Sequence, residues 1–179
     1  MAAIPKTILQ ALMPGLSNAK CDIYLPFLNE AMDEFEINNY ARQAAFLAQI
    51  AHESGELRYM RELWGPTAAQ LKYEGRKDLG NTRLGDGKRF KGRGVIQITG
   101  RANYEHYGKK LGIDLTNAPE MAELPQYTFR IAGCFWQEHC LNDLADDNDF
   151  ELITRTINGG LNGYADRCKY YKKAQELLL

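Results

Sequence analysis

The sequence predicts an α+β fold that is predominantly helical and carries one small β element. Three observations lead to this prediction. Apolar residues recur at helical spacing in several segments, whereas only residues 92–100 alternate with a clear period of two. With 179 residues, of which 45% are hydrophobic, the chain is long enough to bury one proper core. No repeat, low-complexity tract or convincing linker divides it.

The helices are predicted from the spacing of apolar residues and from the residues that end each segment. Pro14-Gly15 stops the first helix, Pro26 fits the first turn of the second, and Gly112 ends a later one. Residues 65–94 are rich in loops and charge, with one helical turn over 67–73. We expect helices over residues 5–13, 25–35, 40–55, 101–111, 150–157 and 165–179, a short one after the turn at 116–120, and a long buried one that starts at Pro125.

The stretch with a period of two is the predicted β element. Ile96 and Ile98 face one side of it, and Gln97 and Thr99 face the other side together with Val95. If the apolar side meets the core, Gln97 and Thr99 point into a cleft. The alternative is an edge strand with one face in water. The flanking glycines permit tight turns and a close approach of a ligand to the backbone.

Glu53 is the residue that stands out in the central helix. At about 100° per residue, Phe46, Ile50, Glu53 and Leu57 fall on one stripe, with Gln49 at its edge. Burial in apolar surroundings raises the pKa of a carboxyl group, which suits a proton donor at neutral pH. The alternative is a glutamate at the boundary of the core, whose stem packs while its carboxylate reaches water.

Glu62 is a second carboxylate that could act with Glu53. On an unbroken helix it would lie about 13 Å further along and half a turn out of phase, too far to share a substrate. Ser54-Gly55 and Gly65-Pro66 allow the helix to end early and fold back. A glycosidase needs two carboxyl groups about 6.5–9.5 Å apart for inversion, or about 5 Å apart for retention. Spacing alone does not choose between these outcomes.

Charge and motif spacing exclude several classes of protein. The formal net charge of -1 gives no global field that would attract nucleic acid. Residues 72–101 nevertheless hold nine Lys or Arg against three acids, which fits either a solvated loop or a basic rim for an anionic polymer. His52-Glu53 begins like the HExxH motif of zinc peptidases, but Glu56 stands where the second histidine belongs.

Cysteine usage and the N-terminus indicate the compartment. Four cysteines show no CxxC and no metal-ligand spacing, so we expect reduced, buried thiols: Cys21, Cys134, Cys140 and Cys168. The N-terminus has neither the apolar run nor the cleavage site of a signal peptide, and no segment is suited to crossing a membrane. We therefore expect synthesis in the cytoplasm and no stable membrane association.

Three segments, in this order, resemble glycoside hydrolase family 19. They are AHESG at residues 51–55, GRGVIQITGRANY at 92–104 and INGG at 157–160. The likeness runs from about residue 22 to the C-terminus and is strongest for the single-domain phage endolysins, which degrade peptidoglycan. The plant-type chitinases form the family's other well-known branch. The resemblance implies a lysozyme-like fold with the β element beside the active-site cleft.

The resemblance also implies roles for individual residues. Glu53 matches the general acid, Glu62 the presumed general base of the endolysin branch, and Thr99 the hydroxyl that helps to hold the attacking water. The family acts by inversion, without a covalent intermediate, which agrees with the wider carboxyl spacing. The predicted substrate-binding residues are Gln97, Asn103, Tyr104, Asn158 and Arg167, the last of which resembles an arginine that supports the catalytic glutamates.

Two departures from the family pattern leave alternatives for the base. Glu56 stands where the family usually has a second glycine, which adds an acid near the mouth of the cleft. The segment between Glu62 and Gly92 is short for the family. Glu56 and, more distantly, Glu74 are therefore alternatives to Glu62 as the base.

These expectations describe an endolysin that hydrolyses β-1,4-glycosidic bonds of peptidoglycan for host-cell lysis. Its partners are glycan strands, it acts as a monomer without metal or other cofactor, and a separate protein permeabilises the membrane first. Residues 1–179 form a single catalytic domain, with a helical N-terminal extension over 1–21 and no separate wall-binding module. The alternatives are a chitinase with the same machinery, a non-catalytic glycan-binding module, and a structural particle protein.

Overall fold

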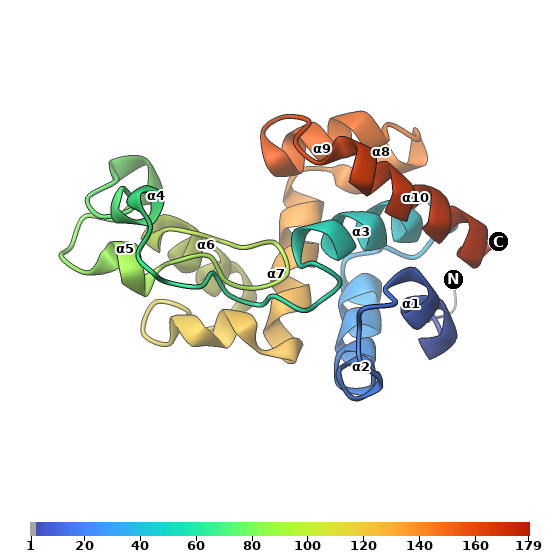
Figure 1. Ribbon diagram of the computed structural model, residues 1–179, viewed down its shortest axis with the longest axis horizontal. Coiled ribbons are helices and arrows are strands. Elements are labelled where there is room, and N and C mark those ends of the chain that lie inside the picture. The colour runs from blue at the N-terminus through green and yellow to red at the C-terminus, as the bar shows by residue number, and fades with distance from the viewer. Residues whose placement is uncertain (1–2) are drawn as a thin grey trace.

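A computed structural model of the protein describes residues 3–179 and arranges their helices in two lobes (Figure 1). The chain passes into the smaller lobe, residues 60–124, after α3 and returns through η2 to α7, which runs along the junction between the lobes. The helices are α1 (Lys6–Leu12), α2 (Asn18–Glu34), α3 (Tyr40–Glu53), α4 (Ala68–Leu71), η1 (Lys77–Leu79), α5 (Asp86–Arg89), α6 (Arg101–Leu111), η2 (Pro119–Glu123), α7 (Pro125–Glu138), α8 (Leu141–Asp146), α9 (Phe150–Asn158) and α10 (Tyr164–Leu178).

The core of the larger lobe is built around α3, which is buried continuously from Gln43 to Ala51. Asn39 starts this helix, because its side-chain oxygen accepts a hydrogen bond from Arg42 N at 2.9 Å. The helix packs against α10 and α8. On the α7 side, Phe46 contacts Trp136 edge to face, with ring centroids 5.2 Å apart. A helix buried on almost every side holds its last residue, Glu53, in a defined place.

The close packing of α2 against α7 depends on Gly133. A Cβ added at this position would lie 2.2 Å from the Phe35 ring, at the end of α2. The absence of a side chain therefore lets the two helices approach. At its start, α7 begins with Pro125, as predicted, since proline fits the first position of a helix.

The smaller lobe contains a short ribbon in place of a regular sheet. Arg93 forms isolated antiparallel bridges with both Arg61 and Ile98. The predicted alternation over residues 92–100 is wrong, because Gly94 and Gln97 adopt positive φ and turn the chain back on itself. Val95, predicted on the cleft side, is fully buried, and its N–H donates to Thr128 Oγ1 of α7 at 2.8 Å. Among the described residues, the predicted β element is thus reduced to these two isolated bridges.

Several boundaries also differ from those expected. Helix α2 begins at Asn18, because Ser17 Oγ accepts a hydrogen bond from Lys20 N, so Pro26 lies inside the helix and not in its first turn. The short helices α5 and α8 were not expected. Of the cysteines, Cys21 and Cys134 are buried as predicted, whereas Cys140 is exposed. The prediction of a predominantly helical chain is confirmed.

The N-terminal segment is packed into the larger lobe. Leu9 and Leu12 of α1 have no exposed surface, and the helix contacts both α2 and α10. The first two residues of the predicted extension lie outside the described residues. Within residues 3–179, no helix combines the length and the apolar character needed to cross a membrane.

Candidate active site

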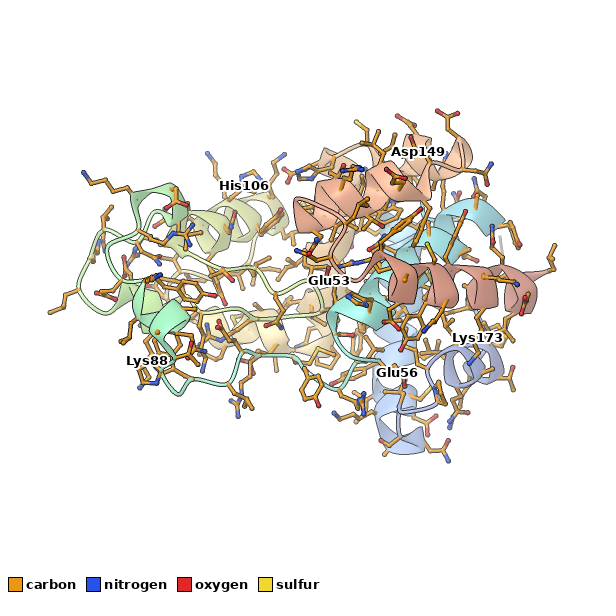
Figure 2. The ribbon with its side chains drawn as sticks, turned by 45° about the horizontal axis from the view of Figure 1, so that its top comes forward. Glu53, Glu56, Lys88, His106, Asp149 and Lys173 are labelled. Atoms are coloured by element: carbon orange, nitrogen blue, oxygen red, sulfur yellow. The ribbon has the colours of Figure 1, made fainter. Side chains whose placement is uncertain are left out.

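Glu53 is the last residue of α3 and lies where the two lobes meet (Figure 2). Its side chain keeps 21% of its surface exposed. Its Oε1 accepts a hydrogen bond at 2.5 Å from Nη2 of Arg167, which is only 2% exposed and comes from α10. The predicted apolar surroundings of Glu53 are therefore wrong, since a buried guanidinium contacts the carboxylate. This contact fixes the direction in which the carboxylate points.

Arg167 is itself held by a chain of buried hydrogen bonds. Its Nη1 donates to Gln49 Oε1 at 2.5 Å, and Gln49 Nε2 donates to Thr154 Oγ1 at 2.9 Å. Thr154 then donates to the carbonyl oxygen of Phe150 at 3.0 Å. These buried groups have no access to water, so each one keeps its hydrogen-bond partner in the protein. The hydrogen bonds therefore fix the position of the Arg167 guanidinium. Helices α3, α9 and α10 thus jointly position Glu53.

Glu62 is held by a different set of contacts, in the smaller lobe. Gln70 Nε2 donates to its Oε1 at 2.9 Å, and the Gly92 N–H donates to its Oε2 at 3.1 Å. The Tyr73 hydroxyl lies 3.4 Å from the same Oε1. Its backbone N–H donates to the Gly92 carbonyl at 2.8 Å, which makes Glu62 part of the ribbon. Both carboxylate oxygens are fixed by donors while the residue remains partly exposed.

Three of the predicted site residues surround Gly92. A Cβ placed at this position would lie 2.9 Å from Gln97 Oε1, 3.3 Å from Glu62 Oε2 and 3.4 Å from Thr99 Oγ1. Gln97 adopts positive φ, and its Nε2 donates to the Gly94 carbonyl at 2.7 Å, which turns its Oε1 toward residue 92. The structure therefore brings Glu62, Gln97 and Thr99 together around a point where only glycine leaves room.

Two of these residues, Gln97 and Thr99, also border a pocket of about 230 Å³. Thr99 donates its hydroxyl to the Gln97 carbonyl at 3.0 Å, and Asn103 Nδ2 donates to the Thr99 carbonyl at 2.7 Å. Glu53 and Glu62 are not among the residues that line this pocket within the described chain. The lining comprises Leu79, Ile96, Gln97, Ile98, Thr99, Asn103, Tyr107, Phe135 and Ile157, so an apolar floor carries a polar edge.

Asn158 ends α9 next to Ile157 of this pocket. Its residue is partly exposed, but its Nδ2 is buried and has no hydrogen-bond partner among residues 3–179. An unpaired buried donor is unusual and costs free energy. Among the predicted sugar contacts, Asn158 is therefore the one whose buried donor is left unpaired by residues 3–179.

Tyr104 does not reach the cleft, so its prediction as a substrate-binding residue is wrong. It has no exposed surface, its hydroxyl donates to the Lys91 carbonyl at 2.6 Å, and it accepts a hydrogen bond from Arg93 Nη1 at 3.0 Å. Burial raises the pKa of Tyr104 to about 12. Arg167, also predicted to bind substrate, is buried against Glu53 and acts on that carboxylate.

The two alternative bases are occupied elsewhere. Glu56 points toward the N-terminal segment and α10, as Figure 2 shows, where it accepts hydrogen bonds from Gly15 N at 2.5 Å and from the Tyr170 hydroxyl at 2.9 Å. Glu74 accepts from the backbone N–H groups of Gly85 and Gly87, at 2.6 and 2.9 Å. Both carboxylates anchor loops, which leaves Glu62 as the candidate base.

Some residues of the site were missed from sequence. Gln70 carried a detectable signal, because Thr67 and Gln70 form a capping box at the start of α4. Thr154 carried none, since a threonine inside a helix has no pattern that distinguishes it. Among residues 3–179, no three His, Cys, Asp or Glu side chains are grouped closely enough to hold a metal ion.

Comparison with known sequences identifies related proteins. The family model of glycoside hydrolase family 19, described as chitinase class I, matches residues 33–145. A Haemophilus influenzae protein described as a glycosyl hydrolase family 19 domain-containing protein is 35% identical over 161 residues, covering 75% of this chain and 78% of that protein. An Arabidopsis thaliana endochitinase is 41% identical over 118 residues, covering 65% of this chain and 38% of that protein. The chain thus spans less than half of this plant relative.

Comparison with solved structures gives the same answer for the fold. A bacterial family 19 chitinase superposes with a TM-score of 0.78 at 23% identity, covering 99% of this chain and 95% of that one. Chitinase C from Streptomyces griseus superposes with a TM-score of 0.75 at 20% identity, covering 98% of this chain and 76% of that one. The predicted lysozyme-like architecture is thereby confirmed.

Proposed function

The chain belongs to glycoside hydrolase family 19, and from that premise we propose that it is an endolysin that hydrolyses β-1,4-glycosidic bonds of bacterial peptidoglycan by inversion. One observation carries the mechanism. Two partly exposed carboxylates, Glu53 and Glu62, are each held by their own hydrogen-bond network, one in each lobe. Separate networks can hold two acids on opposite sides of a sugar, as an acid and a base of an inverting enzyme require.

Glu53 is the proposed general acid. Arg167 donates to Oε1, so Oε2 is the oxygen that carries the proton, and no residue between 3 and 179 forms a hydrogen bond with it. As the bond breaks, this proton passes to the glycosidic oxygen, and the departing sugar leaves with a free hydroxyl. The carboxylate that remains faces the Arg167 guanidinium, which stabilises the new negative charge.

Glu62 is the proposed general base, with Thr99 as its partner in holding water. The Thr99 hydroxyl donates its hydrogen to the Gln97 carbonyl, so the hydroxyl oxygen remains available to accept a hydrogen bond from water. A water that donates one hydrogen to Glu62 and the other to Thr99 keeps a lone pair for the anomeric carbon. Glu62 takes the first of these protons as the new C–O bond forms, and no covalent intermediate arises.

Substitution of the two carboxylates tests these roles. Acid and base catalysis each contribute about 10²–10⁴-fold, so Glu53→Gln and Glu62→Gln should each lower the rate of reducing-end release from purified sacculi by at least about 100-fold. Glu56→Gln is the matched control, because that carboxylate faces Gly15 and Tyr170. Near wild-type release by Glu53→Gln, with an unaltered circular dichroism spectrum, would contradict the assignment.

Chitin is the second candidate substrate, because several relatives are named as endochitinases. Purified sacculi and soluble chitin oligomers, incubated in parallel, separate the two by which one yields new reducing ends. Mass spectrometry of released muropeptides then shows which sugar carries each new end.

For the place of action, we propose synthesis in the cytoplasm and access to the wall through a separate permeabilising protein. We expect permeabilised cells to lyse. Intact cells should not lyse, whether the enzyme is added from outside or produced inside them.

A further inference from the structure

A second pocket, on the smaller lobe, is lined mostly by cations. It has a volume of about 430 Å³, and four basic side chains line it together with one acid: Lys88, Arg89, Lys91, Arg93 and Glu120. We call it the basic pocket. In Figure 2, Lys88 lies out on the smaller lobe, away from Glu53. The pocket shares no lining residue with the one beside Thr99.

The ribbon separates the basic pocket from the candidate base. Arg61 and Arg93 are paired across the antiparallel bridge, and Glu62 pairs with Gly92 at the next position. Because alternate residues of extended chains point to opposite faces, the arginines lie on the face opposite to Glu62. A sugar beside Glu62 would therefore not contact the basic pocket.

Two of the four cations are already satisfied by the protein. Arg93 Nε donates to Glu123 at 2.8 Å, and its Nη1 donates to the Arg89 carbonyl at 2.8 Å. Arg89 donates to the carbonyl oxygens of Thr116 and Asn117, at 3.0 and 2.8 Å. These contacts fix the walls of the basic pocket and hold its shape.

The other two cations have no such partner. Within residues 3–179, no carboxylate lies within 4.0 Å of the ammonium groups of Lys88 or Lys91. Partial burial lowers the pKa of Lys91, and the neighbouring charges of Arg93 and Arg61 lower it further. A bound anion would relieve both the repulsion and the lost hydration. The basic pocket therefore has charge to offer a ligand.

We propose that the basic pocket binds the acidic peptide stems of peptidoglycan, and so holds the wall beside the bond that is cut. This inference rests on the proposed function. Peptide stems carry carboxylates, which can bind Lys88 and Lys91. They also carry amino groups, which can donate hydrogen bonds to the exposed carboxylate of Glu120. A polyphosphate has no cationic group for Glu120 and is repelled by it. Chitin, which has no charge, gains nothing from this site.

The test uses charge removal in an inactive background, so that binding is measured without hydrolysis. Lys88→Gln/Lys91→Gln is compared with Lys172→Gln/Lys173→Gln, which removes the same charge from α10. Each pair contains one exposed and one half-buried lysine. With Glu53→Gln in every protein, the first pair should bind purified sacculi about tenfold more weakly at low salt, and the second pair should bind unchanged.

Removal of the peptides identifies the ligand. After an amidase has stripped the stems from the sacculi, the difference between the two lysine pairs should disappear. Equal binding of the two pairs to intact sacculi would overturn the proposal, as would competition by inorganic phosphate that equals competition by triglutamate. Muropeptide release by the unaltered enzyme is measured in parallel. If muropeptides are released but the two lysine pairs bind sacculi equally, only the proposal for the basic pocket is refuted. If no muropeptides are released, the proposed function is refuted.

Discussion

At the scale of the residue, position 92 shows how the candidate site depends on a missing side chain. The Gly92 carbonyl accepts a hydrogen bond from the Glu62 backbone N–H, and the Gly92 N–H donates to the Glu62 carboxylate. The oxygens of Gln97 and Thr99 also lie close to the space where a Cβ would be. Its φ is not in the left-handed region, so the backbone alone does not require glycine here. The requirement comes from the polar groups around it.

Gly92→Ala should therefore damage activity more than stability. The new methyl group would meet Gln97 Oε1 at 2.9 Å, and this flexible amide can move away, which displaces it from the site. We expect a loss of about 100-fold in kcat for sacculi, because small misplacements of catalytic groups cost that much. The free energy of unfolding should change by less than about 1 kcal/mol. Steady-state kinetics and urea unfolding measure the two quantities.

Gly160→Ala is the control for this prediction. A Cβ at position 160 meets no heavy atom within 4 Å, and its φ is also outside the left-handed region. It should retain activity. Equal activity of the two variants would mean that Glu62, Gln97 and Thr99 do not surround the reacting atoms.

At the scale of the element, Glu56 connects the loop after α3 to the turn between α1 and α2 and to α10. Its Oε2 accepts from Gly15 N, between α1 and α2, and its Oε1 accepts from Tyr170 of α10. Burial and the neighbouring Glu56 carboxylate raise the pKa of Tyr170 to about 12, so its hydroxyl stays a donor at physiological pH. Glu56 is thus placed to act on stability and not on the reaction.

Glu56→Ala should lower the free energy of unfolding by about 1.5–3 kcal/mol, the contribution of hydrogen bonds to a charged group. The rate per folded molecule should remain near that of the wild type. Urea unfolding and active-site-normalised kinetics check both statements. Glu30→Ala removes an exposed glutamate of α2 and should change neither quantity. A large loss of kcat in Glu56→Ala with unaltered stability would restore Glu56 as a rival base.

The elements themselves were predictable where a local signal decides them. Pro125 starts α7 and Gly112 ends α6, as the sequence indicated, because these residues act through their own backbone. The ribbon was not predictable, since the turn at Gln97 depends on contacts between the Gly94 region and α7. Nor was the polar environment of Glu53, because Arg167 reaches it from a distant part of the chain.

At the scale of the whole molecule, a buried ion pair ties α5 to α6. Arg101 donates to both oxygens of Asp86, at 2.5 and 2.9 Å, and the aspartate side chain is 2% exposed. The hydrogen-bonded Arg101 guanidinium lowers the pKa of Asp86 below its usual value. Arg101 also lies over the Phe90 ring, 4.6 Å from its centroid. The pair is therefore part of the packed core of the smaller lobe.

This pair predicts the sign of one acid-dependent contribution to stability. A carboxyl group with a lowered pKa contributes stability that is present above its unfolded pKa, about 3.9, and is lost as pH falls through the folded value. Asp86→Asn should cost about 3–5 kcal/mol at pH 7, because Arg101 is left buried without its partner. Urea unfolding at pH 7, 5 and 3 should show the gap to the wild type narrowing below about pH 4. Parallel stability curves would contradict the assignment.

The contact between Glu53 and Arg167 determines when, during synthesis of the chain, the candidate site can be completed. The two residues are 114 positions apart, so a ribosome incorporates the carboxylate long before the arginine that orients it. A growing polypeptide already contains Glu53, Glu62 and the ribbon while α10 is still missing. Catalytic competence should accordingly arise late in translation, only once α10 has emerged and docked against α3.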